Sequence, residues 1–290
     1  MDLTSEETED IIMSIMGFFI FLIYMFIIVI LLSTARFRRK KSNQLLLNLG
    51  IGHVITGASH FTGMWTTFPI GKFVFVGIMY ANVSLIALSI DRCIYIVRPF
   101  RYSLLRRGWH VIFMLASPVT AIMMLTQHMI SGFDEYVHKG ALSKVPFIVY
   151  VFLTTVSLIG PNLVVFVIVR KQSTRIRAQN HSIISKDEKQ KSRVRVIGKR
   201  QEMRSFYLCF GCVITFIMSW LPLLTLKIIE MTTGRSFSYR YTGGAAIIAN
   251  INLFTDAWFC VWYNKELRKR LKGVFKGSPE TPPTTSVNLE

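Results

Sequence analysis

The 290-residue sequence has few acidic residues, and this shortage narrows the possible functions. Asp and Glu number 16 against 34 Lys and Arg, which gives a formal net charge of +18. A basic stripe on a soluble fold would indicate a nucleic-acid partner, but here the Lys and Arg residues fall between apolar runs. That distribution is typical of a membrane topology, and we expect no nucleic-acid binding.

Cysteine is also scarce, and every cysteine lies within or at the edge of an apolar run. None stands where an extracellular disulfide would be useful. Two of them have the spacing of a redox or zinc motif, but their neighbours are apolar, so we interpret them as small packing residues. We therefore expect no metal and no cofactor. The four are Cys93, Cys209, Cys212 and Cys260.

A signal peptide of the usual kind is absent as well, since residues 1–10 are acidic and contain no basic residue. Apolar residues, by contrast, are plentiful. They make up 51% of the chain, and the mean hydropathy is +0.42. This composition predicts an all-α, polytopic membrane protein with one transmembrane unit.

The apolar residues are grouped in seven runs, each long enough to cross a bilayer. Lys and Arg gather in segments 36–41, 98–107 and 170–204. Because basic loops stay in the cytoplasm, residues 1–10 are expected outside the cell, ahead of a bundle over residues 11–263. The runs are 11–33, 42–64, 69–97, 110–130, 145–169, 205–229 and 241–263.

Residues 264–276 are basic and carry Leu267, Leu271, Val274 and Phe275 on one helical face. This pattern predicts an amphipathic helix on an anionic membrane surface. Residues 277–290 are rich in Pro, Ser and Thr and are expected to be a disordered cytoplasmic tail.

An adjacent acid and base, Asp91 and Arg92, end the third run. Charges at that place are costly unless they face water or a partner, so the pair indicates a function. The alternative is that the two residues only mark where the helix leaves the lipid.

Seven spans, Asp91-Arg92-Cys93 and Trp220-Leu221-Pro222 together resemble a rhodopsin-like (class A) G-protein-coupled receptor. The likeness covers about residues 11–275. Cys93 departs from the family's Asp-Arg-Tyr, whereas Pro99 matches the loop that follows it. The resemblance implies a seven-transmembrane helix bundle that transmits ligand binding to a heterotrimeric G protein.

The resemblance also implies a latch at the inner end of the bundle. Asp91 and Glu202 would hold the Arg92 guanidinium in a resting state and release it to a partner in an active one. The alternative is that Glu202 is one solvated charge in a basic segment.

A second implied switch is a ring beside a proline kink, which couples ligand contact to movement of the helix. The alternative for the ring is that Trp220 only fills the bundle. The matching residues are Pro161, Phe216, Trp220 and Pro222.

The polar interior departs from the family. His53 replaces the sodium-binding Asp, Asp256 replaces the seventh-span Asn, and Tyr24-Met25-Phe26 occupies the depth of the first-span Asn. Imidazole does not replace a carboxylate for Na⁺, so sodium regulation is not expected. We predict a rewritten network in which His53 pairs with Asp256, and a pH bias through His53 is a further hypothesis. Its members are Asn48, His53, Asn252 and Asp256.

The ligand is only partly constrained. Val74 stands where the family's amine receptors carry Asp, and Asn250 where an opsin carries its Schiff-base Lys, so biogenic amines and covalent retinal are not expected. Lys72 and Lys227 would attract an anionic or lipid-like head group, or else they are solvated lysines at the outer ends of their spans.

Two functions remain open. The first is a plasma-membrane receptor, not an enzyme, for a small-molecule, lipid or peptide ligand, with a G protein, arrestin and receptor kinase as partners. The second is a non-signalling decoy or partner subunit, which is favoured because Cys93, Val169 and Cys260 stand where the resembled family has tyrosines. A transporter or channel is disfavoured because no inverted repeat or chain of intramembrane ionisable residues is present.

Overall fold

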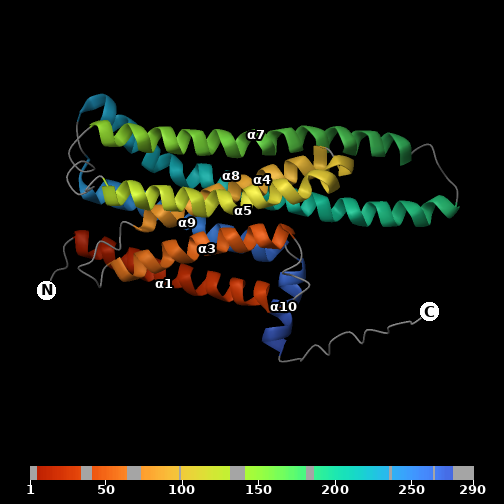
Figure 1. Ribbon diagram of the computed structural model, residues 1–290, viewed down its shortest axis with the longest axis horizontal. Helices are drawn as coiled ribbons and strands as arrows, with labels where there is room; N and C mark the ends of the chain where they lie inside the picture. The colour runs from red at the N-terminus through yellow and green to blue at the C-terminus, as the bar shows by residue number, and fades with distance from the viewer. Residues whose placement is uncertain are drawn as a thin grey trace.

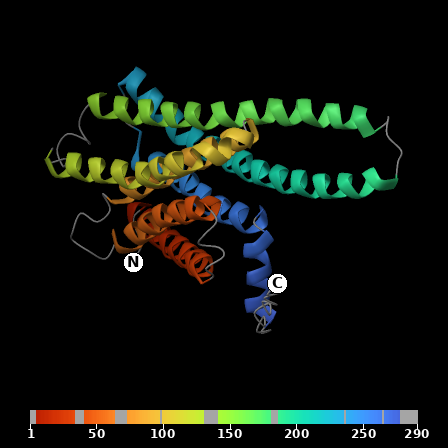
Figure 2. The ribbon, with the colours of Figure 1, turned by 45° about the vertical axis from the view of Figure 1, so that its right-hand side comes forward.

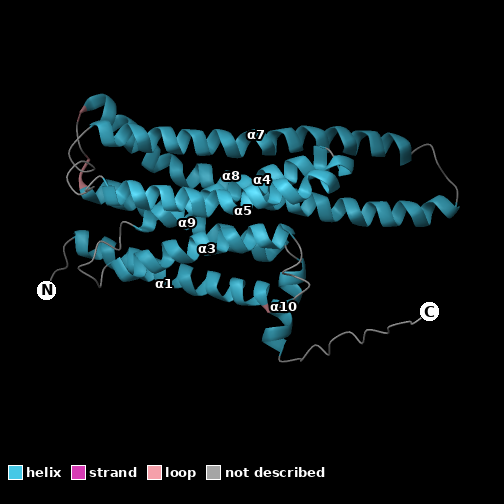
Figure 3. Cartoon of the chain, viewed as in Figure 1, coloured by secondary structure: helices cyan, strands magenta, loops and turns pink. Residues whose placement is uncertain are grey.

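The chain forms helices that run largely side by side (Figures 1 and 3). The computed structural model describes residues 5–33, 41–63, 73–97, 99–130, 141–180, 186–234, 237–263 and 265–276. Within these ranges it contains α-helices and no strand, which confirms the predicted all-α class. The helices are α1 (Ser5–Leu32), α3 (Lys41–Gly63), α4 (Phe73–Val97), α5 (Pro99–Ile130), α7 (Ala141–Asn180), α8 (Lys186–Thr233), α9 (Tyr239–Tyr263) and α10 (Lys265–Lys276).

Five helices contain segments long and apolar enough to cross a membrane, counted over the described ranges. Large apolar side chains cover their outer faces: Phe152 is 61% exposed and Met218 is 65% exposed. A lipid environment accommodates such surfaces, whereas water does not. The architecture is therefore that of a helical, membrane-embedded protein. The five segments are Glu7–Leu32, Phe73–Val97, Ile148–Ile168, Phe210–Thr233 and Arg240–Trp262.

Helices α3 and α5 are not among the five, although the sequence predicts a span in each. In α5 the apolar stretch is short, Gly108–Met123. In α3, polar residues interrupt the apolar ones, and Asn48, His53 and Ser59 are buried against neighbouring helices. These polar groups lower the mean hydropathy of α3. Because they face protein rather than lipid, no polar group among them is exposed to the bilayer.

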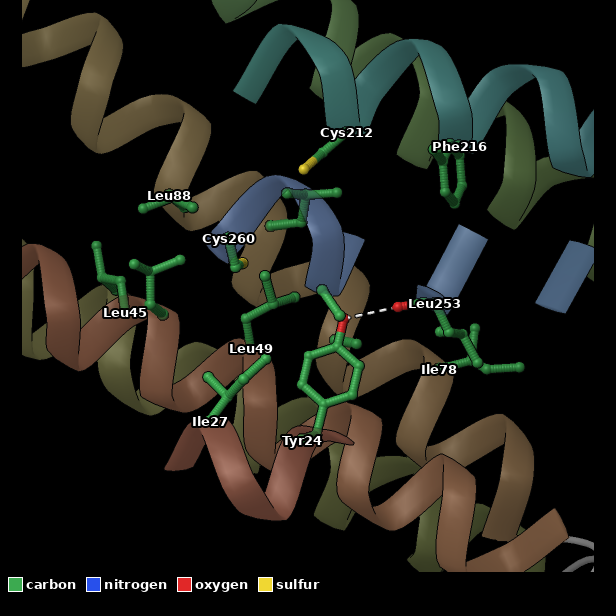
Figure 4. Packing of buried hydrophobic residues seen from close by; sticks show 14 of the residues in the cluster. Tyr24, Ile27, Leu45, Leu49, Ile78, Leu88, Cys212, Phe216, Leu253 and Cys260 are labelled. Carbon is green, nitrogen blue, oxygen red and sulfur yellow. Dashed lines mark hydrogen bonds between the residues drawn. The ribbon is translucent and has the colours of Figure 1, made fainter. Parts of the chain in front are cut away.

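The helices close into a ring around a common core. Helix α3 packs against α1 and α4, α4 against α7, α7 against α8, α8 against α9, and α9 against α1. Helix α5 packs on the outside of α4 and α3 (Figures 1 and 2). Figure 4 shows the core at the meeting of α1, α3, α4, α8 and α9, where Tyr24, Leu49, Leu88, Phe216 and Leu253 converge.

Small residues let α3 and α4 approach closely. A Cβ added at Gly77 in α4 would lie 2.4 Å from the Thr56 Oγ1 atom and 2.6 Å from its backbone nitrogen in α3. A Cβ at Gly52 would lie 2.6 Å from the Ala81 backbone nitrogen. Small residues at such contacts are the usual means of close helix packing in membranes.

We therefore expect Gly77→Ala to destabilise the protein by about 1–3 kcal/mol, the usual range for overpacking. Thr56 contributes backbone as well as side chain at this contact, so the helices must separate. Thermal unfolding of the purified protein in detergent measures the loss. Gly160→Ala in α7 is the matched control, because nothing lies within 4 Å of its added Cβ; equal melting temperatures for the two variants would contradict the packing.

Several helix boundaries differ from the sequence predictions. Helix α1 begins at Ser5. Most of the acidic segment that was predicted to precede the first span therefore forms the first turns of this helix. Helix α5 begins at Pro99, where a loop was expected, because proline suits the first position of a helix. Helix α7 continues past its apolar run to Asn180, and α8 begins ahead of its apolar run, at Lys186. Lys, Arg and Gln in these extensions are good helix formers in water.

Helix α10 covers Lys265–Lys276, the segment predicted as amphipathic. Leu267 is 1% exposed, and Leu271 packs on the main core. The apolar face of α10 thus docks on α9 and α1, which leaves the basic face outward. Its place on a membrane surface stays a prediction, and the tail 277–290 lies outside the described residues.

Candidate functional site

A cavity of about 400 Å³ opens between α1, α3, α4, α8 and α9. Val74 and Asn250, two of the predicted ligand-pocket residues, both line it. Lys72 lies outside the described residues. The lining residues are Glu9, Asp10, Met13, Ser59, His60, Gly63, Val74, Phe75, Ile78, Trp220, Leu223, Gly243, Ala246, Ala249 and Asn250.

Lys227 is not among the residues that line this cavity, and its role as a ligand residue stays a prediction. Its Nζ atom donates to Glu230 Oε2 at 3.0 Å. Glu230 also accepts a hydrogen bond from the Phe237 backbone nitrogen at 3.1 Å. One buried carboxylate therefore holds the lysine and fixes the end of α8 against the start of the segment that leads into α9.

The polar wall of the cavity contains a bonded pair from α3 and α9. His60 Nε2 lies 3.2 Å from Asn250 Oδ1, and the Asn250 amide donates to the Ala246 carbonyl at 2.9 Å. These bonds fix the side chain of Asn250 at the wall of the cavity. The sequence predicts Asn250 as a pocket residue but does not point to His60, because a histidine among apolar residues gives no signal of which face it occupies.

Two of the four predicted transmission residues, Phe216 and Trp220, are in contact beside the cavity. Trp220 lines the cavity, and its ring lies 5.6 Å from the ring of Phe216, which is fully buried. Pro222 lies inside α8 and Pro161 inside α7. Proline leaves a carbonyl in the preceding turn without its usual partner, so α8 can bend beside Trp220.

The structure brings together three of the four predicted network residues. His53 Nε2 lies 3.6 Å from Asp256 Oδ2, and the Asn252 amide donates to the same oxygen at 3.3 Å. His53 is 2% exposed and Asp256 1% exposed. The 3.6 Å contact is that of a charged or polar pair rather than a short hydrogen bond.

Tyr24 completes this cluster, and sequence reasoning missed its role. Its hydroxyl donates to the Leu253 carbonyl at 2.8 Å, as the dashed line in Figure 4 shows, and its ring lies 4.4 Å from the His53 ring. The only signal was that a tyrosine stands at the depth where the resembled family has asparagine. The phenol thus ties α1 to α9 and packs over the imidazole from α3.

In the described part of the chain, Asn48 forms its hydrogen bonds with α4 and α5 rather than with His53 or Asp256. Its amide oxygen accepts a hydrogen bond from the Tyr80 hydroxyl, and its nitrogen donates to the Met114 carbonyl at 3.5 Å. Ser84 and Ser117 bond nearby, with 2.8 Å between their Oγ atoms. Asn48 therefore faces α4 and α5, because the helical position of a residue alone does not say which neighbour it meets.

At the far end of α4, Asp91 is buried and accepts a hydrogen bond from the Tyr102 hydroxyl at 2.7 Å. Arg92 Nε lies 4.0 Å from Asp91 Oδ2 and has no hydrogen-bond partner among the described residues. The side chains of Pro99 and Glu202 lie outside the described residues, so the predicted latch stays a prediction. Tyr102, not foreseen as a partner, bonds Asp91 Oδ1, whereas Arg92 Nε faces the other carboxylate oxygen, Oδ2.

Cys93, Cys212 and Cys260 form no disulfide with one another in the described part of the chain, and the last two are buried in the core. The side chain of Cys209 lies outside the described residues.

Comparison of the chain with models of known protein families and with curated proteins finds no match. Function must therefore be argued from the cavity, the buried cluster and the Arg92 end.

Proposed function

We propose that the chain is a seven-span plasma-membrane receptor of the rhodopsin-like type, which transmits ligand binding in the cavity to a heterotrimeric G protein at the Arg92 end. The observation that carries the proposal is the course of α4. Val74 lines the cavity, and Arg92 follows 18 residues later in the same helix. That separation is about 27 Å along a helix, close to the thickness of a bilayer core.

The contacts between these ends supply a route for transmission. Ligand contact shifts Trp220, the shift is passed to the buried ring of Phe216, and α8 bends at Pro222. Bending moves the inner part of α8 away from α4 and frees Arg92 for the partner. The His53–Asp256 pair between α3 and α9 holds the neighbouring helices in register.

The proposal includes a topology. Residues 1–4 and the start of α1 lie outside the cell, and the tail 277–290 lies in the cytoplasm, where receptor kinase and arrestin act on its Ser and Thr residues. Helices α3 and α5 then cross the membrane with the five apolar ones. Their buried polar side chains support this, since Asn48 and His53 in α3 and Ser117 in α5 are covered by neighbouring helices.

Arg92→Ala is expected to lower G-protein activation to the level of cells without the chain, because the guanidinium is the group released to the partner. Activation is measured with a promiscuous Gα subunit and normalised to surface expression. Arg240→Ala is the control, since Arg240 is exposed at the other end of the bundle, in the first turn of α9. Equal signalling by Arg92→Ala and the unmodified chain would refute the proposal, and a chain without any signalling would favour the decoy.

A further inference from the structure

The charged residues that line the cavity are carboxylates. Glu9 and Asp10 stand at its α1 wall, and no Lys or Arg is present among the described residues that line it. This is opposite in sign to the anion-binding site expected from Lys72 and Lys227. A cavity with this charge favours a cation.

Glu9 is the more informative of the two. It is 9% exposed, and its Oε2 atom is buried without a hydrogen-bond partner among the described residues. A carboxylate oxygen buried without a donor is costly, so its retention calls for a partner that the described residues do not provide. A donor that enters the cavity from outside would supply the missing hydrogen bond.

A glycine in α9 makes room for this carboxylate. A Cβ added at Gly243 would lie 1.6 Å from Glu9 Oε2, so any side chain there would displace the acid. At the neighbouring Gly244 an added Cβ meets nothing within 4 Å. Gly243 therefore leaves the space that the Glu9 carboxylate occupies, whereas Gly244 does not contact Glu9.

The rest of the lining suits an organic body. Trp220 and Phe75 supply aromatic rings, and Met13, Ile78 and Leu223 supply aliphatic surface. A metal ion is disfavoured, because the described residues contain no group of three or more His, Cys, Asp and Glu placed to hold one. The volume of about 400 Å³ is in the range of small-molecule sites.

We propose that this cavity binds an organic ammonium ion, whose N–H groups donate to Glu9 and whose apolar part packs on Trp220. The inference names a ligand class for the receptor proposed above and rests on that function only for its signalling consequence. It revises the expectation against amines, because the acid comes from α1 rather than from the third-span position held by Val74. A charge-assisted hydrogen bond and a cation–π contact are the expected attractions.

The test uses the purified full chain and measures the melting temperature from the reactivity of the buried thiols of Cys212 and Cys260. Phenethylamine, a protonated amine, is expected to raise the melting temperature, whereas its neutral analogue 2-phenylethanol is not. Glu9→Gln should weaken phenethylamine binding about tenfold or more. It should also raise the ligand-free melting temperature, because the unpaired buried charge is gone.

Matched controls separate binding from folding. Glu7→Gln, in the same turns of α1 but exposed and outside the cavity, is expected to bind as the unmodified chain does. Gly243→Ala should lose the response by displacing the carboxylate, and Gly244→Ala should keep it.

Nanodiscs with and without phosphatidylethanolamine distinguish a soluble amine from a lipid amine: a rise in melting temperature that requires this lipid and depends on Glu9 assigns the site to the lipid. A response to neither amine, or one that Glu9→Gln retains, overturns the proposal. Because no G protein is present, this result is independent of whether the chain signals.

Discussion

Asp256→Leu is expected to lower the free energy of unfolding by about 3 kcal/mol, the usual loss when one member of a buried pair is removed. Asp256 is 1% exposed, and its Oδ2 atom faces both His53 and Asn252. Removing it leaves a buried imidazole and a buried amide without an acceptor. Thermal or denaturant unfolding of the purified protein in detergent measures the loss.

A double-mutant cycle with His53→Leu tests the reason for this loss. Leucine at both positions removes the two polar groups together, and such apolar replacements of buried pairs are often neutral or stabilising. We therefore expect the double variant to be more stable than the Asp256→Leu single variant, with a coupling energy of about 1–3 kcal/mol. Losses that simply add would show that the 3.6 Å contact between His53 and Asp256 contributes nothing.

Phe216→Ala is expected to cost about 3–5 kcal/mol, as for other large buried aromatics truncated in a core. Phe216 is fully buried and contacts Trp220 one turn away. Its loss leaves a cavity at the centre of the ring of helices, where α1, α3, α4, α8 and α9 meet. Phe152→Ala is the control, because that ring is 61% exposed on the outer face of α7.

A second substitution at this position distinguishes a residue that transmits ligand contact from one that only fills the core. If Phe216 transmits ligand contact, Phe216→Leu should keep most of the stability but lose ligand-driven signalling at equal surface expression. A variant that loses neither would leave Trp220 and Phe216 as core residues alone. Leucine is the informative substitution because it fills much of the volume and removes the ring.

The helices were predictable because their apolar runs are long and their boundaries are marked by charge. The contact between Phe216 and Trp220 follows from helical spacing, since residues four apart share a face. The pairing of His53 with Asp256 was predicted by aligning the two residues with positions of the resembled family. Helical periodicity does not predict it. Sequence alone does not place residues of the second and seventh runs beside each other.

The positions of Asn48, Tyr24 and Glu9 were not predictable in the same way. Each is a polar residue on a mainly apolar helix, so its partner depends on how neighbouring helices rotate and approach. The burial of Glu9 depends on Gly243, which is far away in the sequence and reveals its role only through the missing Cβ. Helices α5, α7 and α8 were predicted too short because hydropathy marks the lipid-embedded part of a helix, not its ends.

The proposed receptor has the cavity and Arg92 on opposite sides of a membrane that the chain crosses seven times. Epitope tags added before residue 1 and after residue 290, and inserted within 131–140 and 181–185, test this arrangement by antibody access to intact and permeabilised cells. The account predicts that the first tag and the 131–140 tag are reached on intact cells, and the other two only after permeabilisation. Terminal tags on the same side would mean an even number of crossings and would contradict the account.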